Sequence, residues 1–176
     1  MQVEANLEQL RSDYHASKIV PFIGAGLSSP FKVPTWKKLI EEITEKYSKG
    51  KLDFIKQVVD LDLERNDYWR AIDDLKNLAS IEDQDIHSDI AKIINTKQIN
   101  LDDASSHNYV DISKMNFTLH LTTNYEHLLH KYLQCNDIPI LLSDISFNTQ
   151  ELFESKRVCH LHGHISNYGT LVISKE

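Results

Sequence analysis

Three short runs of this chain each follow an apolar stretch and carry glycine or hydrogen-bonding residues, at residues 23–28, 122–126 and 160–164. The first is a glycine-rich turn, the second is centred on an asparagine and the third on a His-Gly pair. In an open parallel sheet the carboxyl ends of the strands meet at one edge, and ligands bind there. The order of the runs therefore predicts an α/β protein whose loops converge on one pocket, shaped for a dinucleotide.

Strand patterns alternate with helical patterns along the chain. Short apolar runs predict strands at residues 18–23, 117–122, 138–142, 157–162 and 170–173. Apolar residues at helical spacing predict an amphipathic helix before Ser17 that covers a face of the sheet, a helix over 36–47 that stops near Gly50, and a helix over 124–133. Because strands that alternate with helices pair in parallel, we expect a Rossmann-like parallel sheet.

From about residue 37 to 115 the apolar spacing stays helical, with no period-two alternation. We expect a helical module here, inserted between the first and second strands, with residues 95–106 as its most loop-like part. Residues 1–176 then form one domain. Only three residues follow the last predicted strand, so we expect the chain to be the N-terminal portion of a domain whose C-terminal part is absent.

Composition narrows the class of partner and the compartment. The net charge is −7, from 19 basic and 26 acidic residues, so no extended positive field exists to attract nucleic acid. No apolar run reaches the roughly 20 residues of a membrane helix, and the N-terminus carries no export signal. Cys135 and Cys159 lie too far apart for a local metal knuckle. We expect a reduced, cytoplasmic protein that binds neither membrane nor nucleic acid.

The glycine-rich turn offers Gly24, Ala25, Gly26 and Ser28 to a ligand. Glycines let phosphates approach the backbone, while free N–H groups and the dipole of the following helix attract them. The usual dinucleotide fingerprint has a third glycine, and Ser29 stands at that position. The alternative is a tight strand-to-helix turn that binds nothing.

Thr123, Asn124 and Glu126 place hydrogen-bonding side chains at a strand-to-helix junction. Thr123 or Asn124 could instead cap the next helix. One cap is enough for one helix, which leaves Asn124 as the better candidate for ligand chemistry.

His160, His162 and His164 alternate, so on a continuous strand they would share a face and could chelate a divalent metal. Gly163 argues against a continuous strand, because a glycine there indicates that the backbone turns. We favour His162 at the strand tip as a general base, and expect His160 and His164 to be ordinary hydrogen-bonded or exposed histidines.

Together these motifs resemble the sirtuin superfamily, and more closely its bacterial sirtuin-like branch found in phage-defence systems. In that branch the glycine turn is commonly followed by Leu-Pro-x-Trp-x-x-Leu, and this chain has Val33-Pro34-Thr35-Trp36-Lys37-Lys38-Leu39. The central motif of the branch commonly reads Thr-Thr-Asn-Tyr-Asp, and here Glu126 replaces the aspartate.

The resemblance implies a domain that binds NAD as its substrate. Asn124 would orient water or the nicotinamide ribose, and His162 would be the catalytic base. The residues that would bind NAD are Gly24, Ala25, Gly26, Ser28, Thr123, Glu126 and Gly163. Deacylases of the superfamily place a cysteine-ligated zinc ribbon soon after the His-Gly pair, and no cysteine follows Gly163. We therefore expect no zinc.

The leading hypothesis is an NADase, the effector of a bacterial anti-phage defence system, that forms a homo-oligomer and is controlled by a regulatory partner or by additional domains. The alternatives are a module that senses NAD or ADP-ribose without cleaving it, an NAD-dependent protein deacylase, and a metal hydrolase built on His160, His162 and His164.

Overall fold

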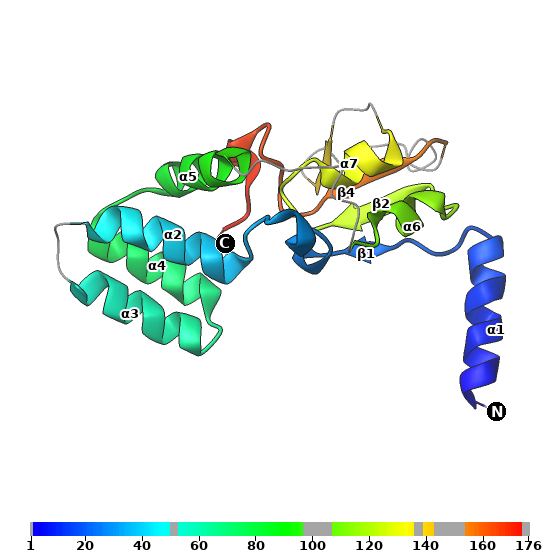
Figure 1. Cartoon of the computed structure of the whole chain (residues 1–176), viewed down its shortest axis with the longest axis horizontal. Coiled ribbons are helices and arrows are strands. Elements are labelled where there is room, and N and C mark those ends of the chain that lie inside the picture. Colours follow the sequence, from blue (N-terminus) through cyan, green and yellow to red (C-terminus); the bar gives the residue numbers. More distant parts are fainter. Residues whose placement is uncertain (1, 50–52, 97–106, 136–138, 143–153, 174–176) are drawn as a thin grey trace.

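The structure is a computed structural model that describes residues 2–49, 53–96, 107–135, 139–142 and 154–173. A group of helices lies on one side, a parallel sheet lies on the other, and a single helix projects beyond the sheet (Figure 1). In the ranges that the structure describes, no helix combines the length and the apolar character needed to cross a membrane.

The sheet has four parallel strands in the order β1-β2-β4-β3. They are β1 (Phe22–Ile23), β2 (Leu119–Thr122), β3 (Ile140–Leu141) and β4 (Arg157–His160). Ile23 pairs with Thr122, and Thr122 pairs with His160. The last residues of β1, β2 and β4 therefore lie side by side, so the loops after them leave from one edge. The predicted α/β class with a Rossmann-like parallel sheet is confirmed.

Helices α2 (Trp36–Ser48), α3 (Asp53–Glu64), α4 (Tyr68–Ala79) and α5 (Asp83–Thr96) follow β1. Their apolar stripes meet in one core, in which Ile40, Ile72 and Ile90 are fully buried. Tyr125 and Leu171, from loops at the edge of the sheet, belong to the same core. The packing of these helices therefore reaches the loop that carries Asn124.

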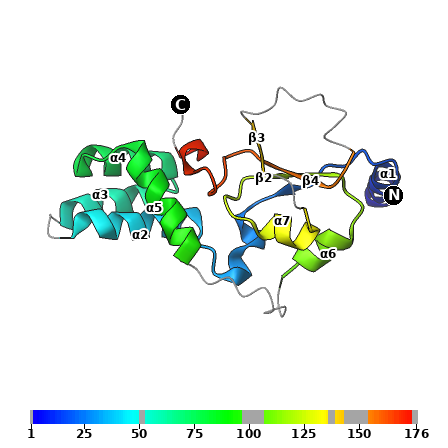
Figure 2. The same cartoon turned by 90° about the horizontal axis from the view of Figure 1, so that it is seen from above.

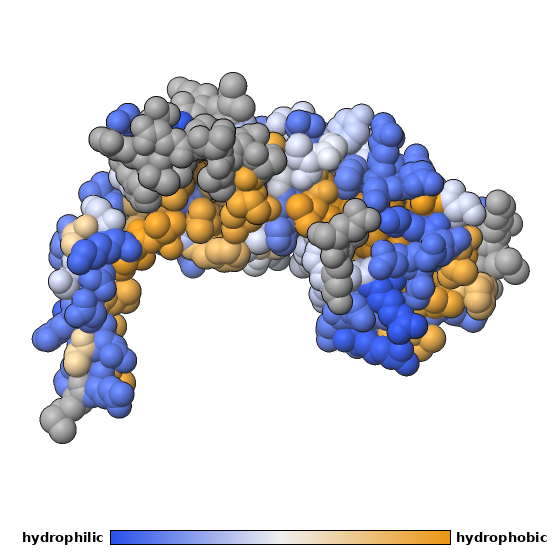
Figure 3. All heavy atoms as spheres, turned by 180° about the vertical axis from the view of Figure 1, so that it is seen from behind, coloured by the Kyte–Doolittle hydropathy of each residue, from blue (hydrophilic) through white to orange (hydrophobic). Residues whose placement is uncertain are grey.

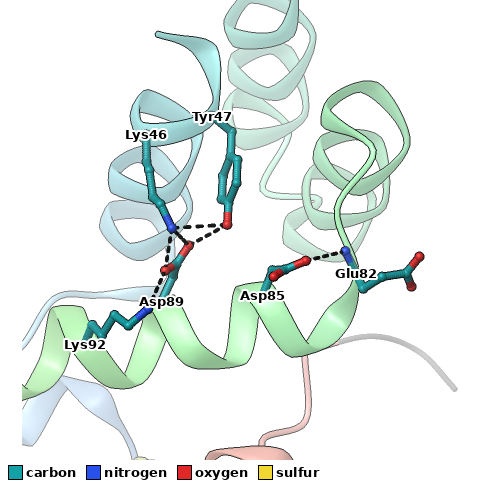
Figure 4. A network of polar contacts seen from close by, with 6 residues as sticks. All are labelled: Lys46, Tyr47, Glu82, Asp85, Asp89 and Lys92. Atoms are coloured by element: carbon teal, nitrogen blue, oxygen red, sulfur yellow. Dashed lines mark hydrogen bonds and ion pairs between the residues drawn. The ribbon is translucent and has the colours of Figure 1, made fainter.

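A polar network joins α2 to α5 (Figure 4). Lys46 Nζ lies 2.6 Å from Asp89 Oδ2, and Tyr47 donates to the same oxygen at 2.8 Å. The Lys46 side chain is half exposed, which limits the strength of the ion pair, but the Asp89 side chain is only 5% exposed and needs these donors. The network holds α5, and with it Ile94, against α2.

Helices α6 (Tyr109–Lys114) and α7 (Leu128–Leu133) lie together on one face of the sheet (Figure 2). Tyr109 is fully buried there and stacks on Tyr132, with ring centroids 5.1 Å apart. The same core contains Ile23 of β1 and Val158 of β4. This packing places the Tyr109 hydroxyl beside Ser28, the last residue of the glycine turn.

Several predicted boundaries were wrong. The run 170–173 is not a strand: Tyr168–Thr170 is a 3₁₀ turn, and Leu171 and Ile173 are buried against the helical group. The helix predicted from Asn124 begins at Leu128. The strands predicted over 18–23 and 157–162 are limited to β1 and β4. Three predicted features lie outside the described residues: the helix stop at Gly50, the start of the strand at residue 138, and most of the loop-like part, residues 97–106.

Helix α1 (Gln2–His15) forms as predicted but does not cover the sheet, so that part of the prediction was wrong. None of its residues is buried, and it extends away from the body (Figure 1). Tyr14 anchors it, because its ring meets Phe117 edge-on and its hydroxyl accepts from Asn116 N at 2.8 Å. Apolar residues gather at this junction (Figure 3), where Leu10, Tyr14, Ile19, Met115 and Phe117 line a groove.

Candidate functional site

A small pocket of about 50 Å³ lies where the ends of β1 and β2 face the helical group. Its sheet side is formed by Ala25, Ser28, Thr123, Asn124, Tyr125 and Glu126. Its helical side is formed by Val33, Pro34, Trp36, Leu39 and Ile94. Two of the three runs that the sequence predicted to converge thus line one pocket. The apolar residues of the helical side would exclude water from whatever binds there.

The glycine turn leaves open space beside its backbone. Ala25–Leu27 form a 3₁₀ turn, and the first N–H groups of such a turn have no partner within it. A Cβ atom added at Gly24 or at Gly26 would meet nothing within 4 Å, and neither residue has a positive φ. Neither glycine is therefore required by the packing or the backbone of the protein. The space beside them suits the close approach of a phosphate.

Ser28 lies at the centre of a buried hydrogen-bond network and is itself fully buried. Its hydroxyl donates to Glu126 Oε1 at 2.5 Å, lies 2.6 Å from Tyr109 Oη, and accepts from Asn124 Nδ2 at 2.9 Å. A hydroxyl has one proton to donate, and here that proton goes to Glu126. In this arrangement Ser28 ties together the turn, α6 and the loop after β2. Its predicted contact with phosphates stays a prediction and requires the network to rearrange.

Glu126 reaches back from the loop before α7. Its Oε2 accepts from Leu128 N at 2.7 Å, which satisfies an N–H group at the start of that helix. Burial raises the pKa of the Glu126 carboxyl, while the hydrogen bonds from Ser28, Leu128 and Asn124 oppose the shift. The extra methylene relative to aspartate thus lets Glu126 bridge Ser28 and the first turn of α7.

Replacing this carboxyl should change how stability depends on pH. The pKa of Glu126 is higher in the folded protein than the ordinary value of 4.5, so above pH 4.5 the folded protein binds more protons than the unfolded chain. The wild type therefore loses stability as the pH rises above 4.5 toward the folded pKa. Glu126→Gln has no such titration. The free energy of unfolding of the variant, relative to the wild type, is therefore expected to increase between pH 4 and pH 7 in urea titrations. Parallel curves for the two proteins would contradict the raised pKa.

Asn124 carries the polar atom best placed for a ligand. Its Nδ2 donates to Ser28 Oγ and, at 3.4 Å, to Gly24 O, which can only accept, so the amide orientation is fixed. Its Oδ1 is buried and, among the described residues, has no hydrogen-bond partner. Buried polar atoms are nearly always paired, and an exception indicates a missing partner. The side chain lines the pocket, so a water or ligand hydroxyl there could supply the missing hydrogen bond.

His162 lies at the same edge of the sheet but outside the residues that line this pocket. It follows His160 by two residues, as Asn124 follows Thr122, and Thr122 pairs with His160. Its carbonyl accepts from Val172 N at 2.9 Å, while its Nδ1 is buried and meets no hydrogen-bond partner in the described part of the chain. Burial lowers the pKa of the imidazole, which favours the neutral ring that a base requires.

Gly163 has a structural reason to be glycine. Its φ is +83°, and a Cβ atom there would overlap Thr170 O. The chain turns at this residue, so the alternating strand that would align three histidines does not form. In the described ranges, no group of three or more His, Cys, Asp or Glu side chains is arranged to hold a metal ion. The metal-hydrolase alternative therefore gains no support from the structure.

Two residues of the site were missed by sequence reasoning. Tyr109 lies 81 positions from Ser28 and comes from the helical stretch, which carries no motif. His130 lies on α7, and its Nε2 is 3.0 Å from His160 Nε2. No spacing in the sequence connects either residue with the pocket, because each contact depends on how α6 and α7 pack on the sheet.

No curated protein matches the sequence of this chain significantly. A family model does match part of it, and the matched part includes β2, α7 and β4. The glycine turn and the helices α2 to α5 precede the match. The segment that carries Asn124, His162 and Gly163, residues 118–176, thus matches the family described as the SIR2-like domain.

Proposed function

We propose that this protein is an NAD hydrolase that cleaves the bond between nicotinamide and ribose. The observation that carries the proposal is the buried Oδ1 of Asn124, which has no hydrogen-bond partner among the described residues and lies in a pocket that the glycine turn also lines. The SIR2-like match at residues 118–176 supports NAD as the ligand, since SIR2-like domains use NAD. An effector role in anti-phage defence, with a regulatory partner or a homo-oligomeric assembly, is part of the same proposal and rests on the resemblance of the motifs.

The glycine turn would hold the pyrophosphate. The space beside Gly24 and Gly26 would let an anion reach the backbone, and the first N–H groups of the 3₁₀ turn that starts at Ala25 have no partner within that turn and could donate to the anion. Trp36 and Leu39 form an apolar wall opposite. The polar backbone of the glycine turn and the apolar side chains of the helical side together suit a ligand that has charged phosphates and flat aromatic rings.

Bond cleavage would depend on positioning. Nicotinamide is cationic in NAD and leaves as a neutral molecule, so it needs little help from an acid, and the positive charge that develops on the ribose must be stabilised instead. Asn124 Oδ1 would accept a hydrogen bond from the attacking water or a ribose hydroxyl. His162 would accept the proton that is released, because its lowered pKa keeps the ring neutral near pH 7.

The purified protein incubated with NAD tests the proposal. We expect free nicotinamide and ADP-ribose to appear in equal amounts as NAD disappears, as measured by liquid chromatography, without any acyl-lysine peptide. Binding of NAD without release of nicotinamide would favour the sensing module. A requirement for an acylated peptide would favour the deacylase, and the absence of binding would overturn the assignment of the ligand.

Gly26→Ala should separate the ligand-binding role of the turn from its role in the fold. The added methyl group meets open space, so the free energy of unfolding is expected to stay within about 1 kcal/mol of the wild type. The same methyl would occupy the space of an approaching phosphate, so the affinity for NAD is expected to fall by about tenfold or more, as measured by calorimetry.

Gly169→Ala is the matched control, because Gly169 also lies in a 3₁₀ turn and a Cβ atom there makes only an ordinary contact of 3.7 Å. This residue does not line the pocket. Both variants should therefore unfold like the wild type, and only Gly26→Ala should bind NAD weakly. Equal affinity for NAD in the two variants would show that the turn binds no phosphate.

A further inference from the structure

A pair of buried histidines lies directly behind Asn124. His160 Nδ1 is 2.7 Å from the backbone carbonyl oxygen of Asn124, and His160 Nε2 is 3.0 Å from His130 Nε2. A carbonyl oxygen can only accept, so His160 carries a proton on Nδ1. In a neutral ring, Nε2 then has a lone pair. His130 must therefore donate its Nε2 proton to His160, and the two tautomers are fixed by the geometry.

The two imidazoles of this pair are buried and stack on each other. His160 is fully buried and His130 is 7% exposed. Their rings stack with centroids 5.2 Å apart and an interplanar angle of 7°. His164 packs edge-on against His160, with ring centroids 4.6 Å apart. Burial, together with the smaller effects of the nearby His130 and His127, lowers the pKa of His160 to about 4 although the hydrogen bond to the Asn124 carbonyl opposes the shift, so the ring is neutral near pH 7.

These contacts complete the support of Asn124. Its backbone N–H donates to Thr122 Oγ1 at 3.0 Å, its side-chain amide N–H group donates to Ser28, and its carbonyl accepts from His160. The first two contacts come from β2 and the glycine turn. The third comes from His160 of β4, which is itself paired with His130 of α7. The residue that presents the unpartnered Oδ1 is thus held from three sides.

We propose that His130, acting through His160, is a positioning residue that holds the Asn124 backbone and thereby aims Oδ1 at the reacting ligand. The catalytic consequence rests on the proposed function, but the hydrogen-bond relay does not. Without the donor on His130, the lone pair of His160 Nε2 is buried unpaired, and the neutral ring can move its proton to Nε2 and release the Asn124 carbonyl.

Two variants of His130 separate hydrogen bonding from packing. The side-chain amide of His130→Gln can still donate to His160 Nε2, whereas His130→Leu fills similar space without a donor. His120→Leu is the control for loss of a buried imidazole. His120 is fully buried on the neighbouring β2, its ring packs edge-on with Phe117, which precedes that strand, and it does not line the pocket.

The first readout is nitrogen NMR of the imidazoles near pH 7, which needs no activity. The wild type is expected to show His160 protonated on Nδ1 and His130 on Nε2. In His130→Leu the side-chain amide signals of Asn124 are expected to shift, while His130→Gln and His120→Leu leave them near their wild-type positions. His160 protonated on Nε2 in the wild type, or unchanged Asn124 signals in His130→Leu, would overturn the relay.

The second readout is nicotinamide release. In His130→Leu we expect kcat to fall about tenfold or more, because a small displacement of a reacting group costs that much, with KM within about threefold of the wild type. His130→Gln is expected to restore most of the rate. A rise in KM with kcat unchanged would overturn the positioning role. A wild type with the expected tautomers but no release of nicotinamide would refute the NADase and leave the relay standing.

Discussion

Asn124→Ala and His162→Ala are each expected to lower the rate of nicotinamide release by about 100-fold or more, because each removes a group placed where charge or a proton must be handled in the transition state. Within the described ranges the Asn124 side chain donates hydrogen bonds to Ser28 and Gly24. Ser28 keeps its contacts with Glu126 and Tyr109 in the variant, so the fold should survive. The assay is the initial rate of nicotinamide release at saturating NAD.

Asn124→Asp is the sharper version of this test. Aspartate has the shape of asparagine but no N–H donor, so it cannot donate to Gly24 O or Ser28 Oγ, and its charge would lie near the Glu126 carboxyl. We expect it to be as inactive as Asn124→Ala and less stable. An Asn124→Asp protein that turns over NAD at the wild-type rate would contradict the role of the amide. Activity retained only in His162→Ala would remove His162 from the mechanism and leave Asn124 in it.

The convergence of two of the three loops on one pocket could be predicted because it depends on local patterns. Short apolar runs that end in glycine or asparagine specify where parallel strands stop, and parallel register then places Ile23, Thr122 and His160 side by side. The meeting of the glycine turn with Asn124 in one pocket follows from that register. The prediction needed no knowledge of how the helices pack.

The errors arose where tertiary contacts decide the outcome. An apolar run such as 170–173 looks the same whether it pairs in a sheet or packs on helices, and here Leu171 and Ile173 pack on the helical group. The residues before α7 have helical spacing, but Glu126 accepts from Leu128 N and Asn124 is held by His160, so the helix starts later. Likewise, α1 has an apolar stripe that no described residue buries.

Gly163→Ala is expected to lower the free energy of unfolding by about 2 kcal/mol or more, since a side chain at positive φ is strained and this one also clashes with backbone. The φ of Gly163 is +83°, and the added Cβ atom would overlap Thr170 O and lie 2.5 Å from Thr170 C. These atoms are fixed because Thr170 N and Leu171 N donate within the 3₁₀ turn. Urea unfolding of the variant, beside Gly169→Ala as the control, measures the effect.

The same substitution separates two reasons for a glycine next to His162. If the reason is the turn, Gly163→Ala loses stability, and it also loses activity because the bond from Val172 N to the His162 carbonyl is disturbed. If the reason is contact with NAD, the variant unfolds like the wild type and loses only affinity for NAD. Gly26→Ala is expected to show that second behaviour, because a Cβ atom there meets open space. A loss of stability in Gly163→Ala and a loss of NAD affinity alone in Gly26→Ala would show that Gly163 maintains the backbone turn while Gly26 leaves room for the ligand. The same result for both variants would contradict the geometry of one of the two turns.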